Sequence, residues 1–386
     1  MKLLWVNPSF LDYRIPLYKE IDERLNKNFK LVYSSKRIPE RCEKKIKETI
    51  GDNAISIKKD KIIPICSGNG FANKGINISI TGGLYKSIKQ AKPEIIIAEG
   101  FFKFTPLTLL YAFIHRIPLI IAYERTKHTE RNCPFYRRWY RRFINLFVSG
   151  YVVNGSLTKE YLISQGVKPE VIFTGAMCAD SAELSKKVLS INDTELISYK
   201  EEILKTKEDK GFTYIFVGRI IPLKGIKYLL KAWEKHIIDF PHDELCIVGD
   251  GELLNDFKKE FSHSSIIFTG AIDYSQIHKY YAVADVFIIP TLEDNWSLVV
   301  PEAMACGLPV ACSIYNGCHP ELVKKDINGR TFDPLNEEDI VETLSYFHSQ
   351  DLKEMGKNSI EIEKEFSPEK TAENIINAAR TILTKK

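Results

Sequence analysis

The chain has 386 residues, of which 44% are hydrophobic, 11% aromatic and 27% charged. At roughly 150 residues per domain this length corresponds to more than one globular unit, and the apolar content excludes a disordered chain. The formal net charge of +4 is too small for this size to indicate a dedicated nucleic-acid binder, so we expect no nucleic-acid partner.

The eight cysteines are scattered along the chain, and no C-x-x-C pair occurs among them. This spacing argues against a zinc site or a redox motif, and we expect reduced, mostly buried thiols. The opening apolar run, Leu3–Val6, is too short for a signal peptide, which favours a cytoplasmic location.

Short apolar runs alternate with helical stretches in the first half of the chain. Runs that are apolar on both faces and separated by helices are typical of βαβ units around a parallel sheet. Arg116 and Pro118 interrupt the most membrane-like stretch, so a helix followed by a buried strand is expected there. We predict one α/β domain over residues 1–180 with strands at Leu3–Val6, Phe29–Val32, Ile62–Ile65, Ile95–Ala98, Leu119–Tyr123, Gly150–Val153 and Val171–Phe173.

A polar, lysine-rich stretch, residues 181–210, interrupts the alternation and is interpreted as a linker region, after which a second α/β domain occupies residues 211–365. Residues 366–386 contain a helix with apolar residues at helical spacing, which we expect to pack back on the first domain. The sequence therefore predicts two Rossmann-like, doubly wound domains facing each other across a cleft that binds the ligand. The strands expected in the second domain are Tyr214–Val217, Leu245–Val248, Ile266–Thr269, Val286–Ile289 and Val310–Cys312.

The common nucleotide motifs are absent. Gly249-Asp250-Gly251 lacks the third glycine of a G-x-G-x-x-G fingerprint, and no G-x-x-x-x-G-K occurs, which disfavours dehydrogenases and P-loop proteins. No D-x-D triplet is present to clamp a metal-bound nucleotide sugar. We therefore expect no metal site and a metal-independent mechanism.

A phosphate site without metal remains. The strand ending at Val217 runs into Gly218-Arg219, and Lys224-Gly225 then opens a helix. Glycine lets the backbone approach an anion closely, and two cations one loop apart can neutralise a diphosphate. The alternative is that Arg219 and Lys224 are ordinary solvated charges, but the strand, loop and helix context favours the phosphate site.

An acidic loop follows the strand Val286–Ile289. Glu293 and Asp294 lie beyond its carboxyl end, and Glu302 opens the next helix. Ligands of doubly wound sheets bind in such loops, and carboxylates accept hydrogen bonds from sugar hydroxyls. Glu302 could instead only favour the helix dipole, which is worth about 0.3–1 kcal/mol.

The second half resembles the donor-binding half of family 4 retaining glycosyltransferases (glycosyl transferases group 1, GT-B fold). The motifs that carry the resemblance are Phe216-Val217-Gly218-Arg219 with Lys224-Gly225, Ile247–Gly251, Phe268-Thr269-Gly270, Tyr280–Val286 and Glu293–Val310. In this family's acid-x7-acid pattern, Glu302 would hold the ribose and Asp294 the donor sugar. The family usually has glutamate at the position of Asp294. Glu293 is therefore the alternative to Asp294, although it lies one residue out of register.

The resemblance also implies that Arg219 and Lys224 bind the diphosphate and that the backbone around Gly270 and Ile272 binds the base. It completes the donor site with Gly218, Asn295, Trp296, Ser297 and Leu298. Many members have a histidine beside the reacting sugar, after the strand that corresponds to Leu119–Tyr123. Here the candidates are Glu124 first and His128 second.

The segment after that strand is basic and aromatic. Over residues 123–142, seven positive residues outweigh two acidic ones, a balance of +5. A solvated helix face is the ordinary interpretation of such a run. Cations interleaved with aromatic rings also suit docking to anionic lipid, so a peripheral position on the cytoplasmic face of the inner or plasma membrane is expected.

From this resemblance we expect a retaining, hexosyltransferase-type enzyme that uses a nucleotide diphosphate sugar, UDP-linked rather than GDP-linked, with no cofactor. Its acceptor would be a glycan or a lipid-linked glycan in cell-surface polysaccharide or glycolipid synthesis, bound by residues 1–180. The alternatives are a sugar-nucleotide epimerase or hydrolase on the same fold, and a non-catalytic carbohydrate- or lipid-binding protein.

Overall fold

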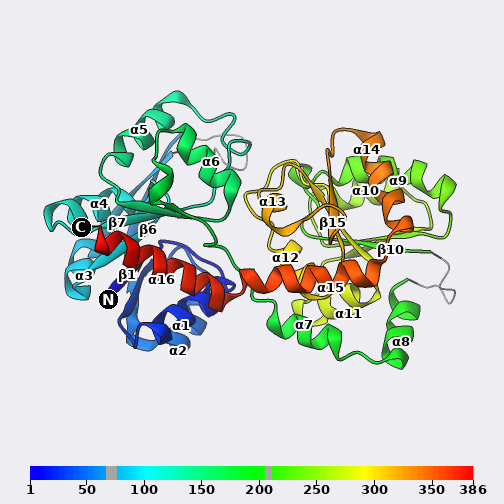
Figure 1. The fold of residues 1–386 in the computed structure, drawn as a ribbon, viewed down its shortest axis with the longest axis horizontal. Helices are drawn as coiled ribbons and strands as arrows, with labels where there is room; N and C mark the ends of the chain where they lie inside the picture. Colours follow the sequence, from blue (N-terminus) through cyan, green and yellow to red (C-terminus); the bar gives the residue numbers. More distant parts are fainter. Residues whose placement is uncertain (67–75, 205–210, 386) are drawn as a thin grey trace. The chain divides into compact units, whose positions relative to one another are not determined.

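The computed structural model describes residues 1–66, 76–204 and 211–385. The chain divides into two compact units (Figure 1). The first contains Met1–Asp180 together with Phe366–Lys386, and the second contains Ser181–Glu365.

The first unit is built on a parallel sheet of seven strands in the order β3-β2-β1-β6-β7-β8-β9. The central strand β1 is fully buried, and its Leu3 pairs with Phe29 on one side and Ile95 on the other. This order, which reverses direction at β1, is that of a doubly wound sheet. The strands are β1 (Leu3–Val6), β2 (Phe29–Ser34), β3 (Ala54–Ile57), β6 (Ile95–Glu99), β7 (Leu119–Tyr123), β8 (Gly150–Val153) and β9 (Ile172–Phe173).

The predicted position of Ile62–Ile65 in this parallel sheet is wrong. These residues lie in β4 (Lys59–Cys66), which pairs antiparallel with β5 (Ile76–Gly82) in a separate two-stranded sheet. The edge position belongs to β3, which ends at Ile57, only two residues before β4 begins. A parallel neighbour needs a crossover of a dozen or more residues, so β4 cannot continue the sheet beside β3.

The C-terminal helix α16 (Pro368–Thr384) packs on the first unit, against α1 and the strands β8 and β9 (Figure 1). Its Ile375, Ala379 and Ile382 are buried in the core shared with the sheet. Gly150 permits this approach, because a Cβ atom there would lie 2.8 Å from the Cδ1 atom of Ile382. The other helices of this unit are α1 (Arg14–Arg24), α2 (Glu40–Ile50), η1 (Gly51–Asn53), α3 (Leu84–Ala91), α4 (Thr105–Ile114), α5 (Phe135–Asn145), α6 (Ser156–Ser164) and η2 (Pro169–Val171).

The second unit is built on a parallel sheet of six strands in the order β12-β11-β10-β13-β14-β15. The strand β15 was not predicted, because its sequence, Gly-Arg-Thr-Phe, is not an apolar run. Its first residue must be glycine, because a Cβ atom at Gly329 would lie 2.0 Å from the carbonyl oxygen of Val310. The strands are β10 (Thr213–Val217), β11 (Glu244–Val248), β12 (Ile266–Gly270), β13 (Val286–Ile289), β14 (Val310–Ser313) and β15 (Gly329–Phe332).

The described part of the lysine-rich stretch forms two helices, α7 (Ala182–Leu189) and α8 (Asp193–Ile203), which pack on α11 within the second unit. Residues 205–210 of that stretch lie outside the described residues. The other helices are η3 (Pro222–Lys224), α9 (Ile226–Asp239), α10 (Leu254–Glu260), η4 (Tyr274–Gln276), α11 (Ile277–Val283), α12 (Val299–Ala305), α13 (His319–Leu322), α14 (Glu337–Tyr346), η5 (Phe347–Ser349), α15 (Leu352–Glu363) and η6 (Lys364–Phe366).

Two further predictions are confirmed. The stretch around Arg116 forms a helix, α4, and then a buried strand, β7, and none of the helices in the described residues is long and apolar enough to span a bilayer. The seven cysteines whose side chains are described are free and buried; the side chain of Cys66 lies outside the described set.

Candidate active site

Two glycine loops pack backbone to backbone at the carboxyl ends of β10 and β11. The amide of Gly218 donates to the carbonyl of Val248 at 3.0 Å, and the amide of Ile220 donates to the carbonyl of Asp250 at 2.9 Å. A Cβ atom on Gly249 would lie 1.9 Å from the carbonyl oxygen of Gly218, so only glycine fits. The close packing fixes the loop that carries Arg219, whose side chain is exposed at this edge.

The loop after β10 is also fastened to the loop after β13. Gly225 has a left-handed conformation with φ of 67°, and a Cβ atom there would lie 2.0 Å from the carbonyl oxygen of Pro290. The amide of Leu292 donates to the carbonyl of Leu223 at 2.9 Å. These contacts bring Lys224, the last residue of η3, against the acidic loop.

Lys224 and Asp294 form an ion pair in which Nζ lies 2.6 Å from Oδ2. The hydroxyl of Ser297 donates to the same carboxylate oxygen at 2.6 Å, and the amide of Trp296 donates to Oδ1 at 3.1 Å. The side chains of Lys224 and Asp294 are only 19% and 14% exposed. The structure therefore places the predicted phosphate-binding lysine in contact with the predicted sugar-binding acid.

Glu302 lies in the first turn of α12 and accepts hydrogen bonds from two tyrosines. The hydroxyl of Tyr274 is 3.3 Å from Oε1, and that of Tyr281 is 3.5 Å from Oε2. Burial, with a further contribution from Glu302, raises the pKa of Tyr281 well above its ordinary value, so this phenol keeps its proton. The sequence reasoning missed both partners, although Tyr281 belongs to a motif that carries the family resemblance.

The remaining predicted donor residues follow the same edge of the sheet. Gly270 has φ of 75° and accepts a hydrogen bond from the amide of Gly249, and Ile272 is half-buried just beyond it. The Oδ1 atom of Asn295 is buried without a hydrogen-bond partner among the described residues. Glu293, the alternative to Asp294, is buried. Trp296 and Ser297 are also buried, beside Asp294, and Leu298 is half-buried.

A second polar cluster lies at the carboxyl edge of the first sheet. Glu124 directly follows β7, and its Oε1 atom is 2.6 Å from Nη2 of the buried Arg14. The same guanidinium is 3.6 Å from Glu99 at the end of β6, which also accepts from the indole of Trp5 at 3.1 Å. Burial, only partly offset by Arg14, raises the pKa of Glu99.

The sequence reasoning found Glu124 but missed Arg14 and Glu99. The available signal was the position of Glu99 directly at the end of a buried strand, the same signal that drew attention to the loop after β13. His128, the second candidate, lies four residues beyond Glu124, is half-buried, and its carbonyl accepts from Nη1 of Arg131 at 2.6 Å.

Comparisons with known proteins bear on the family and the fold. Residues 199–381 match the family model described as "Glycosyl transferases group 1". Residues 199–381 therefore resemble this family. A sulfoquinovosyl transferase of Arabidopsis thaliana is 26% identical over 72% of this chain and 55% of its own length. A UDP-Gal:alpha-D-GlcNAc-diphosphoundecaprenol alpha-1,3-galactosyltransferase of Escherichia coli is 29% identical over 64% of each chain, so these matches span about half to two thirds of the relatives.

The fold of the chain matches solved structures along its whole length. HepE of Anabaena, solved with UDP and glucose, superposes with a TM-score of 0.70 at 16% identity and covers 99% of this chain and 100% of its own. The predicted GT-B fold of two parallel α/β sheets is confirmed, and the predicted family resemblance is confirmed over residues 199–381.

The basic aromatic segment, residues 123–142, does not expose all seven of its positive side chains, so the expectation that the whole +5 segment faces solvent or lipid is wrong for two arginines of α5. Arg137 and Arg141 are buried on the inner face of α5, only 6% and 2% exposed. Arg141 forms a bidentate pair with the buried Glu130, at 2.7 and 3.0 Å, and Arg125 pairs with the same acid at 2.7 Å. Burial alone would raise the pKa of Glu130, but the two arginines outweigh it and lower that pKa.

The outer face of α5 keeps the aromatic residues and part of the charge. Phe135, Trp139 and Phe143 are 77%, 72% and 50% exposed, and the rings of Trp139 and Phe143 stack with centroids 6.5 Å apart. Arg138 and Arg142 lie on the same exposed side of the helix. The candidate membrane surface therefore consists of this outer face alone.

Proposed function

We propose that the protein is a metal-independent, retaining hexosyltransferase that moves a sugar from a nucleoside diphosphate sugar to a glycan or a lipid-linked acceptor. The observation that carries the proposal is the Lys224–Asp294 pair, held at 2.6 Å beside the glycine loop of Arg219. It joins a phosphate-binding cation and a sugar-binding acid on adjacent loops at the carboxyl edge, where doubly wound sheets bind their ligands.

In this proposal Arg219 and Lys224 neutralise the diphosphate and stabilise the charge that develops on it as the glycosidic bond breaks. Preorganised cations at a developing negative charge lower the barrier without reorganisation during the reaction. Glu302, braced by two tyrosine hydroxyls, accepts from the ribose hydroxyls, and Asp294 accepts from the donor sugar.

A UDP-sugar is the proposed donor. The Anabaena protein with the same fold was solved with UDP and glucose, and the E. coli relative is named for UDP-Gal. The base would lie against the backbone around Gly270 and Ile272, and the diphosphate would reach the glycine loop.

For the acceptor we propose a glycan, free or lipid-linked, in cell-surface polysaccharide or glycolipid synthesis. The E. coli relative is named for a diphosphoundecaprenol-linked acceptor, which favours the lipid-linked form. Glu99 and Glu124, both paired with Arg14, offer carboxylate oxygens to sugar hydroxyls at the carboxyl edge of the first sheet. The exposed aromatic face of α5 would hold the protein on the cytoplasmic membrane surface.

The test incubates the full chain with a panel of UDP- and GDP-sugars, with and without lipid-linked glycan acceptors, and detects products by mass spectrometry. We expect acceptor-dependent transfer from a UDP-sugar with retained anomeric configuration. Glu302→Gln should lower transfer, while Glu354→Gln, a change on the exposed face of α15, should not. Donor consumption without an acceptor product would indicate an epimerase or hydrolase, and nucleotide binding without turnover would indicate a binding protein.

A further inference from the structure

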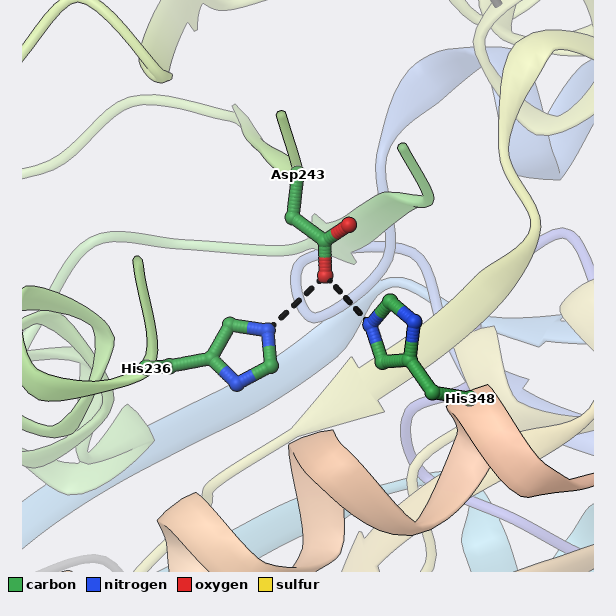
Figure 2. Close-up of side chains that lie close together, drawn as sticks. All are labelled: His236, Asp243 and His348. Atoms are coloured by element: carbon green, nitrogen blue, oxygen red, sulfur yellow. Dashed lines mark hydrogen bonds and ion pairs between the residues drawn. The ribbon is translucent and has the colours of Figure 1, made fainter. Parts of the chain in front are cut away.

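A separate cluster of ligating side chains lies at the opposite, amino edge of the second sheet. His236 lies in the last turn of α9, Asp243 directly precedes β11, and His348 lies in η5 (Figure 2). Both Nε2 atoms point at one carboxylate oxygen, with Oδ2 of Asp243 lying 2.8 Å from His236 and 2.7 Å from His348. The three potential ligand atoms lie within 4.8 Å of one another.

The cluster is enclosed by aromatic rings. The ring of Phe240 stacks on both imidazoles, with centroids 4.9 Å from His236 and 3.8 Å from His348, and Phe212 stacks on His348 at 4.5 Å. The side chains of His236 and Asp243 are 0% and 1% exposed, whereas that of His348 is 22% exposed. His236 and Asp243 are therefore shielded from solvent, and the cluster is reachable at His348.

The buried Asp243 has no lysine or arginine ion-pair partner among the described residues; its two ion-pair contacts are with the histidines. A buried carboxylate is costly unless a positive charge or a metal compensates it. Its second oxygen, Oδ1, accepts from the amide of Phe212 at 2.8 Å, which orients the carboxylate and leaves Oδ2 for the histidines. Such a hydrogen bond to the outer oxygen is how proteins orient metal-binding carboxylates.

We propose that Nε2 of His236, Nε2 of His348 and Oδ2 of Asp243 bind a Zn²⁺ ion. Zinc–ligand distances of about 2.0–2.2 Å place the ligand atoms of a tetrahedral site roughly 3.3 Å apart. The two contacts to Oδ2 need to open by roughly half an ångström to reach that separation. The two imidazole ligand atoms, which lie within 4.8 Å of each other, need to reach the same separation by rotation of the side chains. On binding, each imidazole would be neutral, with Nε2 unprotonated and its one proton on Nδ1, and any proton beyond that would be released to water. The dication would offset the charge of the carboxylate.

The ligand set selects the kind of metal. Ca²⁺ and Mg²⁺ require six or more ligands that are mostly oxygen, and this cluster offers one carboxylate oxygen. Two imidazoles and one carboxylate, completed by a water, form a known zinc ligand set. The ion would link the end of α9, the start of β11 and the η5 segment before α15, so its role is to stabilise the second unit.

This site is distinct from the proposed transfer site and does not depend on it. Strands β10 and β11 carry the glycine loops at their carboxyl ends, whereas Phe212 and Asp243 precede the same strands at their amino ends. The sequence prediction of no metal site rested on the absence of short cysteine and D-x-D motifs. His348 lies 105 residues from Asp243, a separation that no short motif can reveal.

The experiment uses the full chain, stripped with a chelator, dialysed and titrated with ZnCl₂. We expect one zinc per chain by elemental analysis, a rise in melting temperature on adding zinc, and the visible bands of tetrahedral Co²⁺ when cobalt replaces zinc. His348→Gln should weaken zinc binding at least tenfold, and because His348 is partly exposed this variant should fold. Asp243→Asn should do the same.

The matched control is His242→Gln, which changes an exposed histidine next to Asp243 that is outside the cluster. It should bind zinc as the unchanged protein does. Protein that takes up no zinc, or His348→Gln protein that binds zinc as tightly as the control, would leave the cluster a hydrogen-bonded triad and overturn the proposal. Nucleotide binding by a zinc-free protein leaves the proposed transferase function standing, so the two proposals fail separately.

Discussion

The ion pair between Lys224 and Asp294 gives a sharp test of the proposed donor site. The ammonium lies 2.6 Å from the carboxylate, and both side chains are mostly buried. Lys224→Met keeps the aliphatic stem and removes the cation. A charge-assisted hydrogen bond to phosphate is worth about 1.5–3 kcal/mol. Since each 1.4 kcal/mol is about tenfold, Kd for UDP should rise roughly 10- to 100-fold.

Asp294→Asn should have a different effect on the two halves of the donor. An asparagine carbonyl can still accept from the amide of Trp296, which preserves the loop. Removing the negative charge releases Lys224 for the diphosphate, so the Kd for UDP should stay unchanged or fall. Turnover should decrease, because the acid no longer accepts from the donor sugar.

Calorimetry with UDP on the two single variants and the double variant completes a thermodynamic cycle. The double variant should bind UDP more tightly than Lys224→Met alone, because that single change leaves an unpaired carboxylate near the diphosphate. Lys227→Met, which removes an exposed lysine paired with Glu260, is the control and should not change the Kd. Equal weakening by Lys224→Met and Asp294→Asn, or none by Lys224→Met, would refute the assigned roles.

Further predictions concern the membrane face, the buried arginine, pH and chelation. Replacing Arg138 and Arg142 with glutamine should weaken flotation with anionic liposomes at low salt without lowering the melting temperature. Arg141→Met should instead destabilise the fold in urea unfolding, because the buried Glu130 then keeps only the partly exposed Arg125 as an ion-pair partner; the loss should stay below the about 3–5 kcal/mol typical of an uncompensated buried charge. Burial raises the pKa of Glu244 from 4.5 to about 7. The contribution of the protonated carboxyl to the free energy of unfolding is therefore present below pH 4.5 and is lost as the pH rises through 7. Glu244→Gln should remove this pH dependence of the free energy of unfolding. A brief exposure to EDTA should leave sugar transfer intact, and complete loss restored by Mn²⁺ would contradict the two-cation site.

Local sequence patterns predicted most of the fold because the strands are buried on both faces. The runs at Leu3–Val6 and Val286–Ile289 are continuously apolar, and both are central strands. The apolar pattern failed to predict strand pairing where the apolar content of a strand did not determine which strand it pairs with. Ile62–Ile65 is apolar enough for the parallel sheet, but the short connection from β3 directs it into a hairpin. Gly329–Phe332 has too few apolar residues to be recognised, yet it pairs with β14.

The candidate site was predictable where its residues are close in sequence. Asp294 and Glu302 belong to one loop and the helix after it, so a single motif contains both. Arg14 and Glu99 could not be joined to Glu124 in this way, because Arg14 begins α1, Glu99 ends β6 and Glu124 follows β7, and only the sheet order brings these three places together. Arg141 shows a related limit. The count of charges in the segment suggested a solvated helix face, but the position of Arg141 on α5 directs its side chain inward, where it pairs with Glu130.

Chelation should affect the proposed zinc site but not the proposed sugar transfer, because the two sites lie at opposite edges of the second sheet. In the proposed mechanism, Arg219 and Lys224 supply two positive charges at the carboxyl edge, so we expect transfer to need no dissociable ion. At the amino edge, His236, Asp243 and His348 would hold zinc in an aromatic enclosure, and release should be slow because only His348 is reachable from solvent. Short chelation should therefore spare both turnover and stability, whereas prolonged chelation should lower the melting temperature while UDP binding at low temperature persists. Simultaneous, immediate loss of turnover and of bound metal would mean that the metal belongs to the reaction and would contradict this separation.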